Sequence, residues 1–115
     1  MSRLLAIALM LPIAACAVSH PVTGSLPDGE ALRGVMHMAA DGGPTGTIDL
    51  SSSRTTCIGH YQIGDGFKGS VLITCADGRT GIGTMNFRPR PWTIAGTIGG
   101  QTFAATVDPS QTVRP

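Results

Sequence analysis

Charged and aromatic residues are both scarce in this 115-residue chain. Charged residues make up 13% of it and aromatic residues 4%, and eight basic side chains against seven acidic ones give a formal net charge of +1. Nucleic acids and anionic surfaces attract proteins through a concentrated positive field. We therefore expect no nucleic-acid partner, and we do not expect an anionic surface to be the main partner.

The sequence also lacks helical periodicity. No segment combines helix-forming residues with an apolar residue at about every 3.6 positions, whereas 16 glycines and eight prolines separate short runs of alternating apolar and polar residues. This pattern predicts an all-β fold. The runs and their short loops indicate a small antiparallel meander of about seven strands, curled into a barrel or packed as a two-layer sandwich.

Motifs for hydrolytic chemistry are missing as well. The chain contains neither a Gly-x-Ser-x-Gly elbow nor a His-Glu-x-x-His pair. His60 and Asp65 flank a predicted hairpin, and a histidine on the outward face of a strand is usually a solvated side chain rather than a base. We therefore predict no enzymatic activity and no cofactor.

The first sixteen residues have the features of an export signal. A basic start at Arg3 precedes an apolar run through Leu11 that is too short to span a bilayer, and the segment closes with Ile13-Ala14-Ala15-Cys16. This order of charge, apolar core, aliphatic residue, small residues and cysteine resembles the lipobox of bacterial lipoproteins. The resemblance implies that residues 1–15 are a signal peptide, and that Cys16 becomes the lipidated first residue of the mature protein.

The same resemblance implies a position in the cell envelope. Acyl chains on Cys16 would anchor the protein at about 0.8 kcal/mol for each buried methylene group. Ala17 follows the cysteine in place of an aspartate, which by analogy with lipoproteins favours the outer membrane, facing the periplasm. The alternative is an ordinary signal peptide cut near Ala15 or Ala17, which would leave a soluble periplasmic protein.

The mature chain is predicted to form one domain with loose ends. Residues 16–29 are rich in proline and glycine and are expected to form a flexible tether behind the lipidated cysteine. Residues 30–108 hold the alternating runs and form the β-domain. Residues 109–115 are expected to form a loose C-terminal tail.

Cys57 and Cys75 are the cysteines that lipidation of Cys16 leaves, and the envelope is an oxidising compartment. A hairpin with an odd loop centred on Gly66 places the two cysteines opposite each other and Tyr61 opposite Val71. Opposed residues of an antiparallel pair are close enough for a disulfide bond. We therefore predict a Cys57–Cys75 disulfide on the core face of this hairpin.

Two further hairpins have recognisable turns. After Asp77-Gly78-Arg79, a three-residue loop would oppose Val71 to Met85 and keep both on the core face. Around Gly99-Gly100, Trp92 would oppose Val107. This second register places the tryptophan on the core face.

Met36-His37-Met38 combines two thioethers with an imidazole, which are ligands that suit Cu(I). On a strand, however, Met36 and Met38 share one face while His37 points to the other. The three ligands therefore do not converge without a bend. We interpret the methionines as core residues and predict no metal site.

The segment with the strongest functional signature is Arg88-Pro89-Arg90-Pro91-Trp92. Its prolines hold the chain extended, so that Arg88 and Arg90 project beside the single tryptophan. Arginine and tryptophan are enriched in binding hot spots, and arginine binds carboxylates or phosphates bidentately. The alternative is an irregular connection whose prolines protect a sheet edge while Trp92 turns into the core.

Two functions remain open. The first is a lipid-anchored envelope protein whose β-domain is a non-catalytic binding or structural module, held in the membrane by the lipid on Cys16 and contacting an envelope protein or cell-wall glycan. The alternative is an inhibitor of an envelope-attacking hydrolase such as lysozyme, because small periplasmic lysozyme inhibitors are similar in size, lipobox, disulfide and β-barrel. An inhibitor would use a protruding loop, for which residues 64–68 with Phe67 and Lys68 are the candidate.

Overall fold

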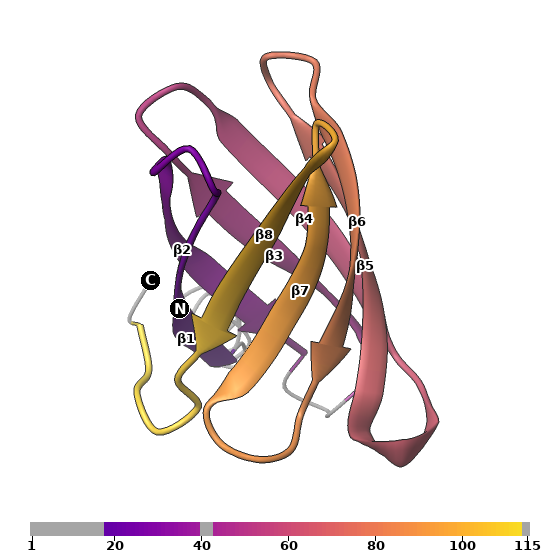
Figure 1. The fold of residues 1–115 in the computed structure, drawn as a ribbon. Coiled ribbons are helices and arrows are strands. Elements are labelled where there is room, and N and C mark those ends of the chain that lie inside the picture. The colour runs from indigo at the N-terminus through magenta and orange to yellow at the C-terminus, as the bar shows by residue number, and fades with distance from the viewer. Residues whose placement is uncertain (1–17, 40–42, 114–115) are drawn as a thin grey trace, which may run out of the picture.

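The structure is a computed structural model that describes residues 18–39 and 43–113. Its eight antiparallel strands form a closed barrel in which each strand pairs with the next and the last closes on the first (Figure 1). The strands are, in chain order, β1 (Val18–Ser25), β2 (Ala31–Met38), β3 (Thr45–Ser51), β4 (Thr56–Ile63), β5 (Lys68–Cys75), β6 (Thr80–Asn86), β7 (Trp92–Ile98) and β8 (Gln101–Val107). The all-β meander is confirmed, as a barrel with eight strands rather than about seven. The lipobox lies outside the described residues.

The eighth strand is β1, which forms where we expected a flexible tether, so that prediction is wrong for residues 18–25. The side chains of His20 and Val22 point inward and are buried. Pro21 is tolerated because its carbonyl accepts a hydrogen bond from the Asp108 amide on the β8 side, at 3.2 Å. An amide N–H at position 21 would point to the same side as this carbonyl. Its absence breaks no ladder bond, because the pairing of β1 with β8 begins one residue later, with Val22 opposite Val107.

The tail is also ordered as far as the structure describes it, so the prediction of a loose segment is wrong through Val113. Beyond β8 the chain runs beside β1, where the β1–β8 ladder has ended. The Val113 amide donates to the Ser19 carbonyl at 2.9 Å, and the Gln111 carbonyl lies 2.6 Å from His20 Nδ1. These contacts give the first residues of β1 a neighbour on the side opposite β2.

Two predicted hairpin registers are confirmed. Cys57 opposes Cys75 and forms the disulfide, and Tyr61 opposes Val71. Trp92 opposes Val107 across the Gly99-Gly100 turn, whose two residues both have positive φ as a tight hairpin requires. Both registers therefore follow from turn length and the alternation of apolar residues.

The β5–β6 register is the one that we predicted wrongly. Its loop has three residues, as expected, but they are Ala76-Asp77-Gly78, because the Cys75 amide bonds to the Arg79 carbonyl. Val71 consequently opposes Gly83 rather than Met85. A shift of two residues leaves every side chain on its predicted face, so the alternating pattern does not distinguish the two registers.

Apolar side chains fill the interior of the barrel. Eight large side chains are fully buried, and they come from all strands except β4: Val22, Met36, Ile48, Val71, Met85, Ile94, Ile98 and Val107. The outer face is polar over most of the described strands. Ile58, Leu72 and Ile82 are exceptions, each more than half exposed on β4, β5 and β6.

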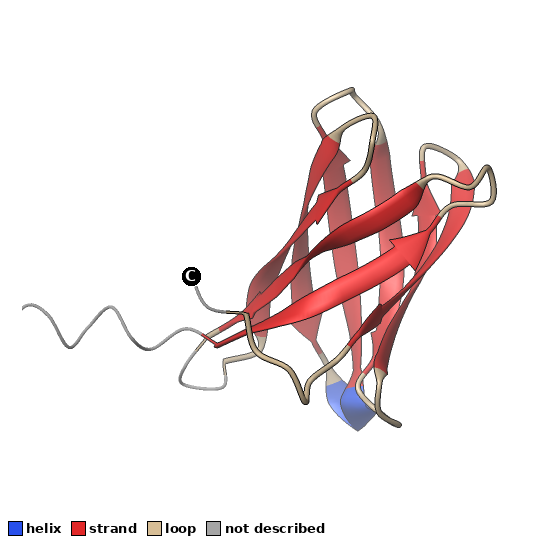
Figure 2. Ribbon diagram, turned by 90° about the vertical axis from the view of Figure 1, so that its left-hand side faces the viewer, coloured by secondary structure: helices blue, strands red, loops and turns tan. Residues whose placement is uncertain are grey.

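The two ends of the barrel differ in composition. The Trp92 rim, which lies at the bottom in Figure 1, has as its described parts the start of β1, residues 43–44, 64–68 and 87–92, and the tail 108–113. The Glu30 rim at the other end consists of residues 26–30, 52–55, 76–79 and 99–100. Figure 2 shows the short 3-10 turn (Asp65–Phe67) that marks the Trp92 rim.

Candidate functional site

The β4–β5 loop presents an aromatic ring to solvent at the Trp92 rim. Gly66 and Phe67 both have positive φ, of 72° and 60°. Glycine adopts this left-handed region without strain, whereas a bulky aromatic residue seldom occupies it. Phe67 is nevertheless 51% exposed. Such a conformation at a loop tip is a common mark of a functional residue.

The β6–β7 connection holds the tryptophan inside the rim and the arginines outside it. Arg88 and Arg90 are exposed, and each is joined to the following proline by a cis peptide bond. Trp92 is half-buried, with its ring centroid 5.1 Å from that of Phe87 and 5.7 Å from that of His20, both edge-on. Both interpretations of the segment therefore hold in part: Trp92 packs against the core, and the arginines project.

A direct contact joins the two loops. The guanidinium carbon of Arg88 lies 3.8 Å from the centroid of the Phe67 ring, in cation–π geometry. The backbone supports this contact, because the Phe87 amide donates to the Phe67 carbonyl at 2.8 Å. The structure thus places at one end of the barrel the five residues that the sequence placed on two separate segments: Phe67, Lys68, Arg88, Arg90 and Trp92.

The cations of this rim have no carboxylate partners among the described residues. Neither Lys68, Arg88 nor Arg90 forms an ion pair with any carboxylate in residues 18–39 and 43–113. Asp65 is exposed on the same loop as Lys68. A second described carboxylate at this rim, Asp108, accepts hydrogen bonds from the Ser110 hydroxyl and amide, which lower its pKa. Within the part of the chain that the structure describes, no carboxylate therefore competes with an external anion for these three cations.

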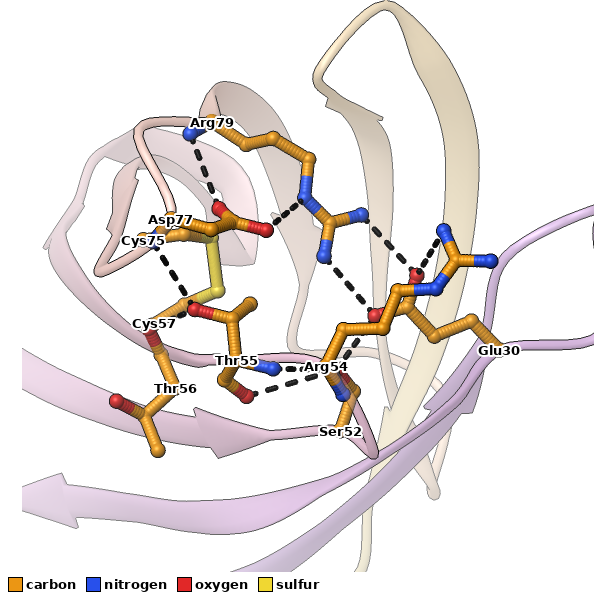
Figure 3. Close-up of a disulfide and its surroundings, with 9 residues drawn as sticks. All are labelled: Glu30, Ser52, Arg54, Thr55, Thr56, Cys57, Cys75, Asp77 and Arg79. Atoms are coloured by element: carbon orange, nitrogen blue, oxygen red, sulfur yellow. Dashed lines mark hydrogen bonds and ion pairs between the residues drawn. A yellow bond between two sulfur atoms is a disulfide. The ribbon is translucent and has the colours of Figure 1, made fainter.

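The Glu30 rim, in contrast, pairs its charges internally (Figure 3). The Glu30 side chain is 2% exposed and receives two hydrogen bonds from the Arg79 guanidinium, at 3.1 and 3.0 Å. Ser52 donates a third hydrogen bond to it, and Arg54 lies 3.7 Å from it. Arg79 is in turn held by Asp77, at 2.9 Å.

These contacts shift the ionisation of both partners. The hydrogen bonds from Arg79 and Ser52, in that order, lower the pKa of Glu30 from 4.5 to about 2, although burial acts in the opposite direction. The Glu30 carboxylate raises the pKa of Arg79 above its ordinary value. The cluster links three loops beside the Cys57–Cys75 disulfide, and its saturated hydrogen bonding indicates a structural role.

Sequence reasoning missed this cluster for a clear reason. Its charged members come from three turns that are distant in sequence, and each turn by itself resembles an ordinary solvated connection. Only the barrel closure places Glu30 beside Arg79. The short signal Asp77-Gly78-Arg79 identified a turn but not a partner for its arginine.

The Met36-His37-Met38 segment has the predicted orientation. Met36 is completely buried, Met38 packs against the core, and His37 points outward. His37 Nε2 lies 2.8 Å from the Asp49 carboxylate and Nδ1 lies 2.9 Å from the Ser19 hydroxyl. No group of three or more His, Cys, Asp or Glu side chains arranged to hold a metal ion occurs within residues 18–39 and 43–113.

The described part of the protein is a small antiparallel barrel of eight strands whose interior is filled by apolar side chains. Its fold is similar to that of a de novo designed fluorescence-activating β-barrel, with a TM-score of 0.61 and 15% sequence identity over 78% of this chain and 89% of that chain. This similarity concerns the fold alone. Comparisons with protein families and with curated proteins give no match. Among the described residues, no helix has the length and apolar character needed to cross a membrane.

Proposed function

We propose that this protein is a lipid-anchored component of the bacterial cell envelope, and that its barrel is a non-catalytic binding module facing the periplasm. The lipobox-like segment ending at Cys16 supports the anchor and, by analogy, the outer membrane. One observation carries the binding role: Arg88 lies over the exposed ring of Phe67, and Lys68 and Arg90, exposed on the same two loops, have like Arg88 no carboxylate partner among the described residues. The Trp92 rim is therefore the binding surface.

The filled interior supports a surface contact rather than a bound small molecule. Binding cups of barrels need inward-facing space, but here large apolar side chains such as Met36 and Ile94 occupy it. Contacts at hot spots use arginine and aromatic residues held in place by packing. Arg88 meets this description, because the Phe67 ring positions its guanidinium group.

The test is a crosslinking pull-down from intact envelopes with the native lipidated protein. A Cys16→Ser variant removes the anchor, and an Arg88→Gln/Arg90→Gln variant removes the rim cations. Arg33→Gln, on the exposed side of β2, is the matched control for loss of a surface charge. We expect one envelope component to be recovered by the native and R33Q proteins and lost with R88Q/R90Q. Equal recovery by all forms would contradict the proposed surface.

Inhibition of an envelope-attacking hydrolase such as lysozyme is the second candidate function. The exposed Phe67 at the tip of a disulfide-bearing hairpin favours it, because inhibitors present a rigid loop to an active site. The purified C16S protein would then inhibit lysozyme, and Phe67→Ala would abolish inhibition while R33Q would not. The binding-module proposal expects no inhibition by any of the three.

A further inference from the structure

The start of β1 lies very close to the proposed lipid anchor. Ala17 is the single residue between Cys16 and Val18, where β1 begins. An extended chain covers at most about 3.6 Å per residue, so the Cα atoms of Cys16 and Val18 are within about 7 Å of each other. The headgroup region of a bilayer is about 5–7 Å deep on each side. A linker of one residue is too short to lift the barrel away from the bilayer surface.

The part of the barrel at this position is the Trp92 rim. His20, the third residue of β1, contacts the Trp92 ring, and Ser19 bonds to the tail of the same rim. The row of rings continues from His20 through Trp92 and Phe87 towards the Phe67 loop. An anchor on Cys16 therefore brings this end of the barrel, rather than the Glu30 rim, against the membrane.

From this geometry we propose that the Trp92 rim rests on the phospholipid headgroups of the leaflet that holds the lipid of Cys16. The inference rests on the proposed function, because it requires a lipidated Cys16. The lipid supplies the affinity for the membrane, and the rim sets the orientation of the barrel. The Glu30 rim then points away from the membrane.

The chemistry of the rim suits a headgroup layer. Tryptophan is enriched where apolar chains meet headgroups, and arginine and lysine bind phosphate groups. Arg88, Arg90 and Lys68 have no carboxylate partners among the described residues, whereas Arg79 and Arg54 on the Glu30 rim do. The near-neutral charge of the whole chain conceals this difference between the two ends.

The same placement makes the rim a poor site for a bulky soluble partner. A protein that bound Phe67 or Arg88 would have to enter between the barrel and the membrane, although the lipidated residue, Cys16, is only two residues from the start of β1. The headgroup layer needs no such space. The observations therefore favour phospholipid over a soluble hydrolase as the occupant of the rim, and an envelope component recovered through Arg88 and Arg90 would itself have to lie at the membrane surface.

Trp92 supplies a direct test, because it is the only tryptophan in the chain. The native lipidated protein is reconstituted in vesicles of phosphatidylcholine and phosphatidylglycerol, with or without a nitroxide spin label on the headgroups as a contact quencher. We expect headgroup-labelled lipid to cause a loss of Trp92 fluorescence. An unchanged signal in vesicle-bound protein overturns the orientation.

A matched control places the fluorophore at the other end. The Trp92→Phe/Ser53→Trp variant carries its tryptophan on the exposed β3–β4 turn of the Glu30 rim, about 20 Å away for strands of seven or eight residues. We expect no loss of fluorescence from this variant in headgroup-labelled vesicles. Equal quenching of both proteins would mean that the barrel lies on its side, and would also overturn the proposal.

The arginines are tested in the same vesicles. We expect R88Q/R90Q to lose part of the Trp92 quenching, while R33Q retains it. Flotation of the protein with the vesicles and the mass of the Cys16 peptide are measured in parallel. A protein that carries no lipid and does not float overturns both this inference and the proposed anchor. A floating protein with an unquenched Trp92 overturns the orientation alone.

Discussion

Gly96 occupies a position where the neighbouring strand leaves no room for a side chain. A Cβ atom placed there would lie 2.0 Å from the Ile82 carbonyl oxygen and 2.5 Å from the Gly83 Cα. Because these are backbone atoms, a methyl group can be accommodated only by moving β6 and β7 apart. We expect Gly96→Ala to lower the free energy of unfolding by about 1–3 kcal/mol, measured by urea denaturation. Gly64→Ala is the control, since its nearest neighbour is 3.7 Å away; an equal loss would contradict the close approach at Gly96.

Glu30 makes the stability of the barrel depend on pH in the acid range. Its pKa is about 2 in the folded protein and 4.5 when unperturbed, so the unfolded state binds the proton more tightly. The contribution of ionised Glu30 to the stability of the folded barrel is therefore fully present above about pH 5 and is lost as the pH falls from about 4.5 to about 2. We expect the free energy of unfolding to decrease over this range in urea titrations.

The Glu30→Gln variant isolates this effect. It keeps the shape of the side chain and removes the carboxylate that Arg79 binds, so we expect a less stable protein at pH 7. Its stability should then vary less between about pH 5 and pH 2 than that of the native protein. Part of the dependence remains, because the pKa of Asp108 is also lowered. Parallel pH profiles for the two proteins would rule out Glu30 as the source.

At the scale of elements, the β4–β5 hairpin is held by its disulfide as well as by its register. The bond joins residues 18 positions apart, and closing a loop of that size restricts the unfolded chain. We expect Cys57→Ser/Cys75→Ser to lower the free energy of unfolding by about 3 kcal/mol without changing the fold. Reduction of the native protein with dithiothreitol should give the same decrease. A fold lost on reduction would show that the register depends on the bond.

The tail acts as a ninth segment beside β1. Removal of residues 109–115 eliminates the bonds from Val113 to Ser19 and between His20 and the Gln111 carbonyl. At about 0.5–1.5 kcal/mol for each bond, we expect a loss of about 1–3 kcal/mol in urea denaturation. Gln111→Ala keeps the carbonyl and has an exposed side chain, so it should change stability by less than about 0.5 kcal/mol. Truncation without effect would mean that the tail is loose in solution.

The elements that sequence reasoning identified are those in which two signals agree. In the β4–β5 and β7–β8 hairpins, turn glycines and alternating apolar residues specify a single register. In β5–β6 the alternation fixes only the face, because registers two residues apart bury the same side chains. Residues 18–25 contain Pro21 and Gly24, whose composition resembles a linker, and their place in the barrel depends on a distant strand, β8.

The candidate site was predictable as residues but not as a surface. Arg88 and Phe67 each stood out in the sequence, one in a proline-rich segment and the other in a hairpin loop. Their contact depends on how β5 and β6 pair, which brings the two loops to the same end of the barrel. The Glu30 cluster depends on closure in the same way. Long-range pairing, rather than local propensity, is what the sequence did not reveal.

At the scale of the whole molecule, closure determines how the barrel can meet other molecules. A closed sheet has no free edge, so an extended peptide cannot be added as a further strand. Contacts must then use side chains on a rim or on the outer wall. The wall is polar over most of its described area, and the exposed apolar side chains of Ile58, Leu72 and Ile82 interrupt it.

The division between inside and outside is itself testable with one pair of isoleucines on neighbouring strands. Ile94 on β7 is 2% exposed and points into the barrel, whereas Ile82 on β6 is 63% exposed on the wall. We expect Ile94→Ala to cost about 2–5 kcal/mol, because it leaves a cavity in a filled core. Ile82→Ala should cost less than about 1 kcal/mol, which is the range for a cross-strand contact on a solvated face. Urea denaturation of the two variants compares them directly, and equal losses would mean that the wall around Ile82 is covered in solution.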